Sequence, residues 1–146
     1  MSIHVVFFDL GETLVTAQRA WLPGAKAMLA SLKAQGFRLG IISNTSGLAD
    51  RTAILGILPV DFDLAVFEPA LVLFSSEVGV EKPHRQIFEK AVAAASVPSA
   101  QCLFCTEEAV STLVAQAVGL RSLRIVTRST DLARLDSYLS DVQSNV

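Results

Sequence analysis

A run of apolar, β-prone residues near the N-terminus ends abruptly in a carboxylate. Residues 5–14 read VVFFDLGETL, so Asp9 follows four apolar residues directly. Continuous apolar runs are typical of strands that are buried on both faces of a parallel sheet. We therefore expect a buried strand over residues 3–8 that delivers Asp9 to the carboxyl edge of a sheet, where open α/β sheets bind their ligands.

Segments that resemble strands and helices alternate along the rest of the chain. The pattern predicts further strands over residues 38–44, 71–74, 102–105 and 123–126. It predicts helices over residues 25–35, 48–55, 83–95, 109–118 and 131–139, with an irregular connection over 57–69. Such alternation favours a Rossmann-like α/β sandwich, with a five-stranded, mostly parallel sheet and helices on both faces. The length of 146 residues fits a single domain, which we expect to span residues 1–146.

Composition narrows the range of partners. The net charge is −2, and positive and negative residues are interspersed. The chain therefore has no basic stripe of the kind that indicates nucleic-acid binding. No apolar run approaches the roughly 18 residues of a membrane span, and the N-terminus does not resemble a secretory signal. We expect a cytoplasmic protein that binds neither nucleic acid nor membrane.

Cys102 and Cys105 have the C-x-x-C spacing of a redox pair, but they lie on a predicted strand, where residues three apart point to opposite faces. We expect two buried thiols without chemistry.

Four predicted strands are followed by polar side chains. These are Asp9, Ser43 with Asn44, Lys82 beyond the third strand, and Glu107. Taken singly, most have ordinary roles, because Ser and Asn form turns and caps, loop lysines are solvated, and acids complement a helix N-terminus. Taken together, they combine a carboxylate nucleophile, a hydroxyl donor, a lysine and a second carboxylate. This set suits Mg²⁺-assisted phosphoryl transfer through a covalent aspartyl intermediate.

The order of these motifs resembles the haloacid dehalogenase (HAD) superfamily over nearly the whole chain. Residues 8–14 (FDLGETL) resemble its first motif, Asp-x-Asp-x-Thr, and residues 41–44 (IISN) its second. Residues 77–83 (EVGVEKP), followed by Ile87 and Phe88, match the third. Residues 103–107 (LFCTE) and then 117–120 (AVGL) resemble a degenerate fourth.

The resemblance implies a role for each motif residue. Asp9 would be the nucleophile, and Lys82 would stabilise the aspartate and the phosphoryl group. Ser43 would donate to a phosphate oxygen, and Asn44 would add its backbone N–H.

The resemblance also implies a metal site. Mg²⁺ would sit on Asp9, the backbone carbonyl of Gly11 and an acid of the fourth motif, either Glu107 or, as a second choice, Glu108. Thr13 would be a structural hydroxyl that braces the loop.

Two departures from the family pattern bear on activity. Gly11 stands where the phosphatases carry a second aspartate as general acid and base, a kind of group that typically contributes about 10²–10⁴ in rate. Glu12, one position on, is a candidate substitute. In the fourth motif, Ser111 stands where a later acid often falls.

The connections are too short for an inserted cap domain, so we expect a minimal core with an open site. An open site suits a phosphorylated small molecule, a phosphorylated macromolecule, or a protein partner that supplies a lid. Trp21 either belongs to such a contact surface or packs onto the domain.

Three functions compete. The first is a Mg²⁺-dependent phosphatase, slow on generic substrates. The second is a catalytically impaired relative that binds a phosphate group or a protein partner without efficient turnover. The third is a dehalogenating hydrolase, which is disfavoured because its small substrates need an enclosed pocket.

Overall fold

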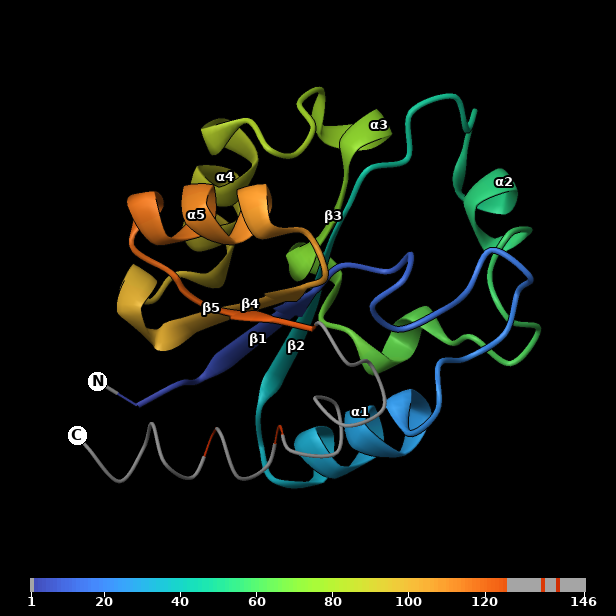
Figure 1. Cartoon of the computed structure of the whole chain (residues 1–146), viewed down its shortest axis with the longest axis horizontal. Helices are drawn as coiled ribbons and strands as arrows, with labels where there is room; N and C mark the ends of the chain where they lie inside the picture. Colours follow the sequence, from blue (N-terminus) through green and yellow to red (C-terminus); the bar gives the residue numbers. More distant parts are fainter. Residues whose placement is uncertain (1, 126–134, 136–138, 140–146) are drawn as a thin grey trace.

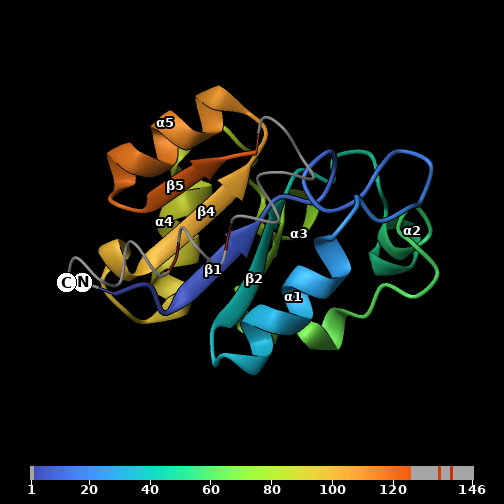
Figure 2. The same ribbon diagram turned by 60° about the horizontal axis from the view of Figure 1, so that its bottom comes forward.

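Five parallel strands form the centre of the fold in the computed structural model, which describes residues 2–125, Leu135 and Leu139. They are β1 (Val5–Phe8), β2 (Arg38–Ser43), β3 (Val72–Phe74), β4 (Cys102–Thr106) and β5 (Arg121–Arg124). Their order across the sheet is β3-β2-β1-β4-β5, and each neighbouring pair is parallel (Figure 2). The predicted α/β fold with a five-stranded sheet is confirmed.

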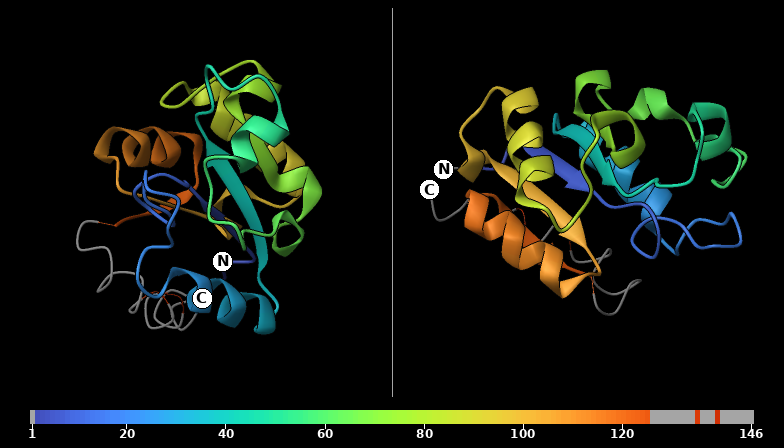
Figure 3. Two further views of the ribbon diagram at one scale, coloured as in Figure 1. Left: turned by 90° about the vertical axis from the view of Figure 1, so that its right-hand side faces the viewer. Right: turned by 90° about the horizontal axis from the view of Figure 1, so that it is seen from above.

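Helices cover both faces of this sheet. They are α1 (Ala25–Ala34), α2 (Arg51–Leu55), α3 (Ser75–Val78), α4 (Arg85–Ala95) and α5 (Ala109–Val118). In Figures 1 and 3, α4 and α5 lie on one face of the sheet and α1 lies on the other. None of the helices in the described part of the chain is long and apolar enough to cross a membrane. The helix predicted over residues 131–139 falls mainly outside the described residues.

The side chains of β1 alternate between two hydrophobic cores. Val6 and Phe8 belong to the cluster on the α1 face, whereas Val5 and Phe7 belong to the cluster with α4 and α5. All four are fully buried, as expected for a central strand covered on both faces. The sheet is therefore the middle layer of three.

The two cysteines also point to opposite faces. Cys102 packs in the cluster of Val5 and Phe7, and Cys105 packs in the other cluster. Both are free and fully buried. Burial raises the pKa of the Cys102 thiol to about 11 and also raises the pKa of the Cys105 thiol, so both stay protonated and unreactive near neutral pH. The structure thus confirms the expectation that both thiols are buried and unpaired with each other.

Several predicted element ends were wrong, and local capping explains two of them. The helix expected from residue 48 begins at Arg51, because the Asp50 side chain caps it by accepting the Ala53 N–H at 2.9 Å. The helix expected from Pro83 begins at Arg85, because His84 is its N-cap and accepts the Gln86 N–H at 3.1 Å.

Other differences are shifts of a few residues or a missed turn of helix. The first and third strands start at residues 5 and 72, and α1 ends one residue earlier than expected. Residues 75–78, which the sequence pattern left without an element, form α3. The fifth strand spans residues 121–124, two residues earlier than predicted. Leu103 of β4 pairs with Arg121, which fixes the register of β5. This strand is too polar to be recognised from its sequence pattern.

The chain order reverses beside β1. From β1 the chain moves to β2 and β3 on one side, and it later returns to β4 and β5 on the other. Loops leaving β1 and β4 therefore diverge to opposite sides at the carboxyl edge. A reversal of this kind marks the crevice where open α/β sheets bind ligands.

Candidate active site

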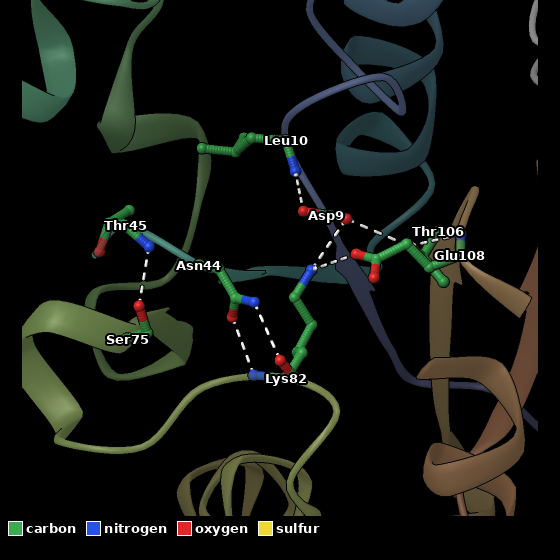
Figure 4. A network of polar contacts seen from close by, with 8 residues as sticks. All are labelled: Asp9, Leu10, Asn44, Thr45, Ser75, Lys82, Thr106 and Glu108. Carbon is green, nitrogen blue, oxygen red and sulfur yellow. Dashed lines mark hydrogen bonds and ion pairs between the residues drawn. The ribbon is translucent and has the colours of Figure 1, made fainter. Parts of the chain in front are cut away.

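Asp9 lies at the carboxyl end of the central strand. Its N–H donates to the Cys105 carbonyl at 3.0 Å, so its backbone continues the ladder between β1 and β4. Its carboxylate is buried, and Oδ1 accepts the Leu10 N–H at 2.8 Å. Oδ2 accepts the Thr106 hydroxyl at 3.1 Å (Figure 4). The sheet thus fixes both the backbone and the carboxylate of this residue.

Lys82 provides the positive charge that faces this carboxylate. Its Nζ atom lies 2.8 Å from Asp9 Oδ2 and 3.6 Å from Glu108 Oε1. The lysine side chain is only 1% exposed, and its ammonium group lies 5.7 Å from the centroid of the Phe104 ring. A buried lysine is rare unless it is paired, because burial of a lone charge is costly. Two buried opposite charges at the ligand-binding edge therefore form the core of the site.

The side chain of Asn44 holds the loop that carries Lys82. Lys82 N–H donates to Asn44 Oδ1 at 2.8 Å, and Asn44 Nδ2 donates to the Lys82 carbonyl at 3.0 Å. Both bonds are drawn in Figure 4. The family resemblance implied only a backbone contact from Asn44 to phosphate, so this clamp is an additional role for its side chain.

The loop after β2 is held by buried hydroxyl groups. Thr45 N–H donates to Ser75 Oγ at 2.7 Å, and Thr45 Oγ1 lies 2.7 Å from Ser76 Oγ. Ser43, the last residue of β2, is buried beside this network. The structure therefore brings Ser43 and Asn44 to the same edge as Asp9 and Lys82.

Of the two acids after β4, Glu108 reaches the lysine. Glu108 N–H donates to Thr106 Oγ1 at 3.2 Å, and its carboxylate lies within ion-pair distance of Lys82. Glu107 lies in the same turn, where its carbonyl accepts the Arg124 Nε–H at 3.2 Å. The contacts thus bring the alternative acid, Glu108, into the cluster, while the metal role of Glu107 stays a prediction.

The loop after Asp9 departs from one expectation. The Thr13 hydroxyl, expected to brace the loop, is fully buried and has no hydrogen-bond partner in the described part of the chain. Bracing comes instead from the backbone, because the N–H groups of residues 13–15 all donate to the Leu10 carbonyl at 2.9–3.2 Å. Glu12 adopts a left-handed backbone with φ of 61°. Ser111, on α5, is likewise fully buried without a partner among the described residues.

Trp21 packs onto the domain, which decides between the two roles expected for it. Its ring stacks on Phe62 with centroids 5.3 Å apart, and its Nε1–H donates to Asp61 Oδ1 at 2.8 Å. Hydrogen bonds from Lys26 and Trp21 lower the pKa of the Asp61 carboxyl group. The ring therefore anchors the connection between β1 and α1.

Thr106 is a site residue whose role the sequence did not reveal. It is fully buried, and it links Asp9 Oδ2 to the start of α5. A threonine at a strand end is too common to single out. The sequence feature that could have indicated its role is its position directly after the apolar run of the strand next to β1.

This fold and site define a hydrolase-like α/β protein that carries a paired aspartate at the end of its central strand. A family model described as haloacid dehalogenase-like hydrolase matches residues 10–105, more than half of the chain. The chain belongs to the haloacid dehalogenase-like hydrolase family.

Comparison with curated proteins gives partial matches. The chain is 34% identical over 103 residues to a glyceraldehyde 3-phosphate phosphatase from Pyrococcus abyssi, covering 70% of this chain and 41% of that protein. It is 25% identical over 139 residues to Protein CbbY from Rhodobacter capsulatus, covering 91% of this chain and 59% of that protein. The chain thus spans less than two thirds of the length of these relatives.

Solved structures share the fold. A protein of uncharacterised function from Listeria monocytogenes matches with a TM-score of 0.77 at 22% identity, covering 97% of this chain and 99% of that chain. A HAD family enzyme from Bacteroides thetaiotaomicron, in complex with magnesium and inorganic phosphate, matches with a TM-score of 0.66 at 13% identity. That alignment covers 84% of this chain and 94% of that one.

Proposed function

We propose that this protein is a phosphatase that transfers a phosphoryl group from a phosphate monoester to Asp9, with Mg²⁺ as cofactor. The observation that carries the proposal is the 2.8 Å contact between Lys82 Nζ and Asp9 Oδ2, buried at the carboxyl edge where the strand order reverses. The names of the Pyrococcus relatives support a small phosphorylated molecule as the substrate class.

Two displacements at phosphorus complete the proposed reaction. An Asp9 oxygen first attacks the phosphorus atom, the bond from phosphorus to the ester oxygen breaks, and the leaving alkoxide takes up a proton from water. Water then attacks the phosphorus of the aspartyl phosphate, the bond to Asp9 breaks, and inorganic phosphate leaves with Asp9 restored. Lys82 offsets the negative charge of the attacking carboxylate and of the phosphoryl oxygens, and Ser43 donates to one of those oxygens.

The residues at the site fit a magnesium ion. Asp9 Oδ1 accepts the Leu10 N–H and keeps a lone pair for a cation, and the nearby Glu108 carboxylate and Gly11 carbonyl are further oxygen donors of the kind Mg²⁺ prefers. No three acidic, His or Cys side chains gather at one place among the described residues, this edge of the sheet included, so the proposed ion would rely on two carboxylates and a backbone carbonyl. When bound, the ion would neutralise charge on the phosphoryl oxygens. We assign it to Asp9, the Gly11 carbonyl and an acid after β4.

Gly11 favours a second candidate function, a phosphate-binding protein with little turnover. Apart from the two neighbouring residues, no atom lies within 4 Å of where a Cβ at Gly11 would be. The same open space accommodates a larger residue. The site can therefore be given the missing acid without a steric clash at Cβ.

One experiment separates the two functions. Hydrolysis of 4-nitrophenyl phosphate with Mg²⁺ would be measured for the wild type, Asp9→Asn, Gly11→Asp and Gly11→Asn. The aryl leaving group needs little protonation, so we expect wild-type activity that Asp9→Asn abolishes. On an alkyl phosphate we expect Gly11→Asp to raise the rate about 10²-fold or more. Gly11→Asn is the matched control, because it adds the same bulk without an acid.

The outcomes are distinct. Activity only in Gly11→Asp would favour the phosphate-binding function for the natural chain. Equal rates in wild type and Asp9→Asn would exclude Asp9 as the nucleophile. No activity in any variant, with no thermal shift by Mg²⁺ plus beryllium fluoride, would exclude both functions.

A further inference from the structure

A pocket of about 420 Å³ opens beside the candidate active site. It lies between the loop that follows β1, the end of β2, and α2 with the turn that follows it. Figure 2 shows the loop and α2 next to each other beyond the carboxyl edge of the sheet. The volume of the pocket lies within the range of about 300–1,000 Å³ that is typical of small-molecule sites. The proposed phosphoryl transfer at Asp9 does not itself use this pocket.

The walls of this pocket differ in chemistry. Gly11, in the loop after Asp9, and Ser43, at the end of β2, both line it. Because Leu10 and Gly11 directly follow Asp9 and line the pocket, a phosphoryl group on Asp9 would sit next to the pocket and the rest of the substrate would enter it. The remaining apolar walls are formed by Leu10, Val15, Ala17, Ile54, Ile57 and Leu58.

Five polar side chains line the pocket, those of Glu12, Thr16, Ser43, Asn44 and Thr45. Three of them contact other groups of the protein. Asn44 uses its amide on the Lys82 main chain, and Thr45 Oγ1 contacts Ser76. Thr16 Oγ1 accepts the Gln18 N–H at 3.2 Å. A sugar or polyol would meet few hydrogen-bond partners along the apolar walls, and a buried hydroxyl group without a partner is costly. An apolar group would instead gain from leaving water.

We propose that this pocket binds the leaving group of the substrate, and that this group is a compact apolar alcohol, aryl or short alkyl, rather than a polyol. The proposal rests on the proposed function, because it takes the phosphoryl group to be held at Asp9. Ile57 is half exposed, at 51%, so part of the pocket wall is an apolar surface that faces solvent in the free protein. A substrate with an apolar group would cover it.

The test compares benzylphosphonate with methylphosphonate, two probes that cannot be hydrolysed at the P–C bond. Calorimetric titration with Mg²⁺ present is expected to give roughly tenfold or more tighter binding of the benzyl compound, since each buried methylene contributes about fourfold. Ile57→Ser should lose most of that preference. Val60→Ser is the matched control, because Val60 lies three residues after Ile57, is 93% exposed and does not line the pocket. Ala17→Phe, at an exposed wall position, should fill the pocket and weaken only the benzyl compound.

Turnover gives an independent comparison. We expect a higher kcat/KM for benzyl phosphate than for glycerol 3-phosphate, and Ile57→Ser should reduce that ratio more than Val60→Ser. Equal binding of the two phosphonates, or equal effects of the two serine variants, would overturn the proposal and leave the phosphatase function standing. Failure of both phosphonates to bind, with no hydrolysis of either ester, would overturn the phosphatase function and the proposal with it.

Discussion

The side chain of Asn44 holds the main chain of Lys82 by two hydrogen bonds, one to its N–H and one to its carbonyl. Asn44 follows β2, whereas Lys82 lies in the loop before α4, so the clamp joins two separate parts of the carboxyl edge. The clamp fixes the backbone from which Lys82 Nζ reaches Asp9 Oδ2. Asn44 is therefore a positioning residue for the lysine.

We expect Asn44→Ala to lower kcat for 4-nitrophenyl phosphate by roughly ten- to a hundredfold, because small displacements of a reacting or stabilising group are costly. KM should change little, since the backbone N–H assigned to phosphate remains. Ser46→Ala is the matched control. It removes the 2.7 Å bond from Ser46 to Glu81 in the same loops and leaves the clamp intact. Equal kcat in the two variants would contradict the positioning role.

The buried pair predicts an asymmetry in stability. Lys82→Met leaves the Asp9 carboxylate buried without its cation, and loss of one member of a buried pair typically costs about 3–5 kcal/mol. Asp9→Asn should cost less, because Lys82 keeps Glu108 at 3.6 Å. Urea denaturation of both variants gives the free energies of unfolding. A larger loss for Asp9→Asn would contradict the described pairing.

Measurements of metal binding can show which of the two acids after β4 is the Mg²⁺ ligand. We expect Glu108→Gln to weaken Mg²⁺ binding by about tenfold or more, because its carboxylate is the one beside Lys82 and Asp9. Glu107→Gln, an identical change one residue earlier, should have the smaller effect. Calorimetric titration with Mg²⁺ measures both. A larger effect of Glu107→Gln than of Glu108→Gln would mean that Glu107 is the ligand.

Gly40 on β2 has no room for a side chain. A Cβ there would lie 2.6 Å from Phe7 Cδ1 and 2.7 Å from the Leu71 carbonyl oxygen, and a carbonyl on the backbone cannot move aside easily. We expect Gly40→Ala to lower the free energy of unfolding by about 1–3 kcal/mol. Gly11→Ala, with open space at the same atom, is the control and should change stability far less. Similar values for both would contradict the tight packing at β2.

Arg38 and Glu68 predict a change of stability with pH. Arg38 donates from Nε and Nη2 to the two Glu68 oxygens at 3.0 and 2.6 Å, and this bonding lowers the pKa of the Glu68 carboxyl group. Because the pKa is lower in the folded state, the pair stabilises the fold above the unfolded-state pKa of about 4.3 and loses this effect as pH falls through the folded value. The side chains are 34% and 39% exposed, so the contribution is only about 0.5–1 kcal/mol.

The measurement is the free energy of unfolding of wild type and Glu68→Gln from about pH 6 to about pH 3. The difference between them should shrink as pH falls. Glu89→Gln, which disrupts an exposed pair with Arg85, should give a smaller difference throughout. A difference that grows at low pH would mean that folding raises the pKa of Glu68 instead of lowering it.

Much of the site followed from one regularity in the sequence. Asp9, Ser43 and Lys82 each lie at or beyond the carboxyl end of an apolar strand, and parallel strands end at a common edge, so their meeting was predictable. The contact of Glu108, and not Glu107, with Lys82 was not predictable, because it depends on how one turn orients two adjacent side chains. The starts of α2 and α4 were missed because Asp50 and His84 cap their helices, and the sequence pattern does not separate such a cap from a first helical residue.

The site draws its parts from β1, β2, β4 and the loop before α4, which are far apart along the chain. Each contact between them closes a long loop in the unfolded chain, and such closures cost entropy that only the finished sheet offsets. A nascent chain that has emerged only as far as β2 carries Asp9 without its lysine or its threonine. The aspartate, the lysine and the threonine therefore come together only after β4 has joined the sheet.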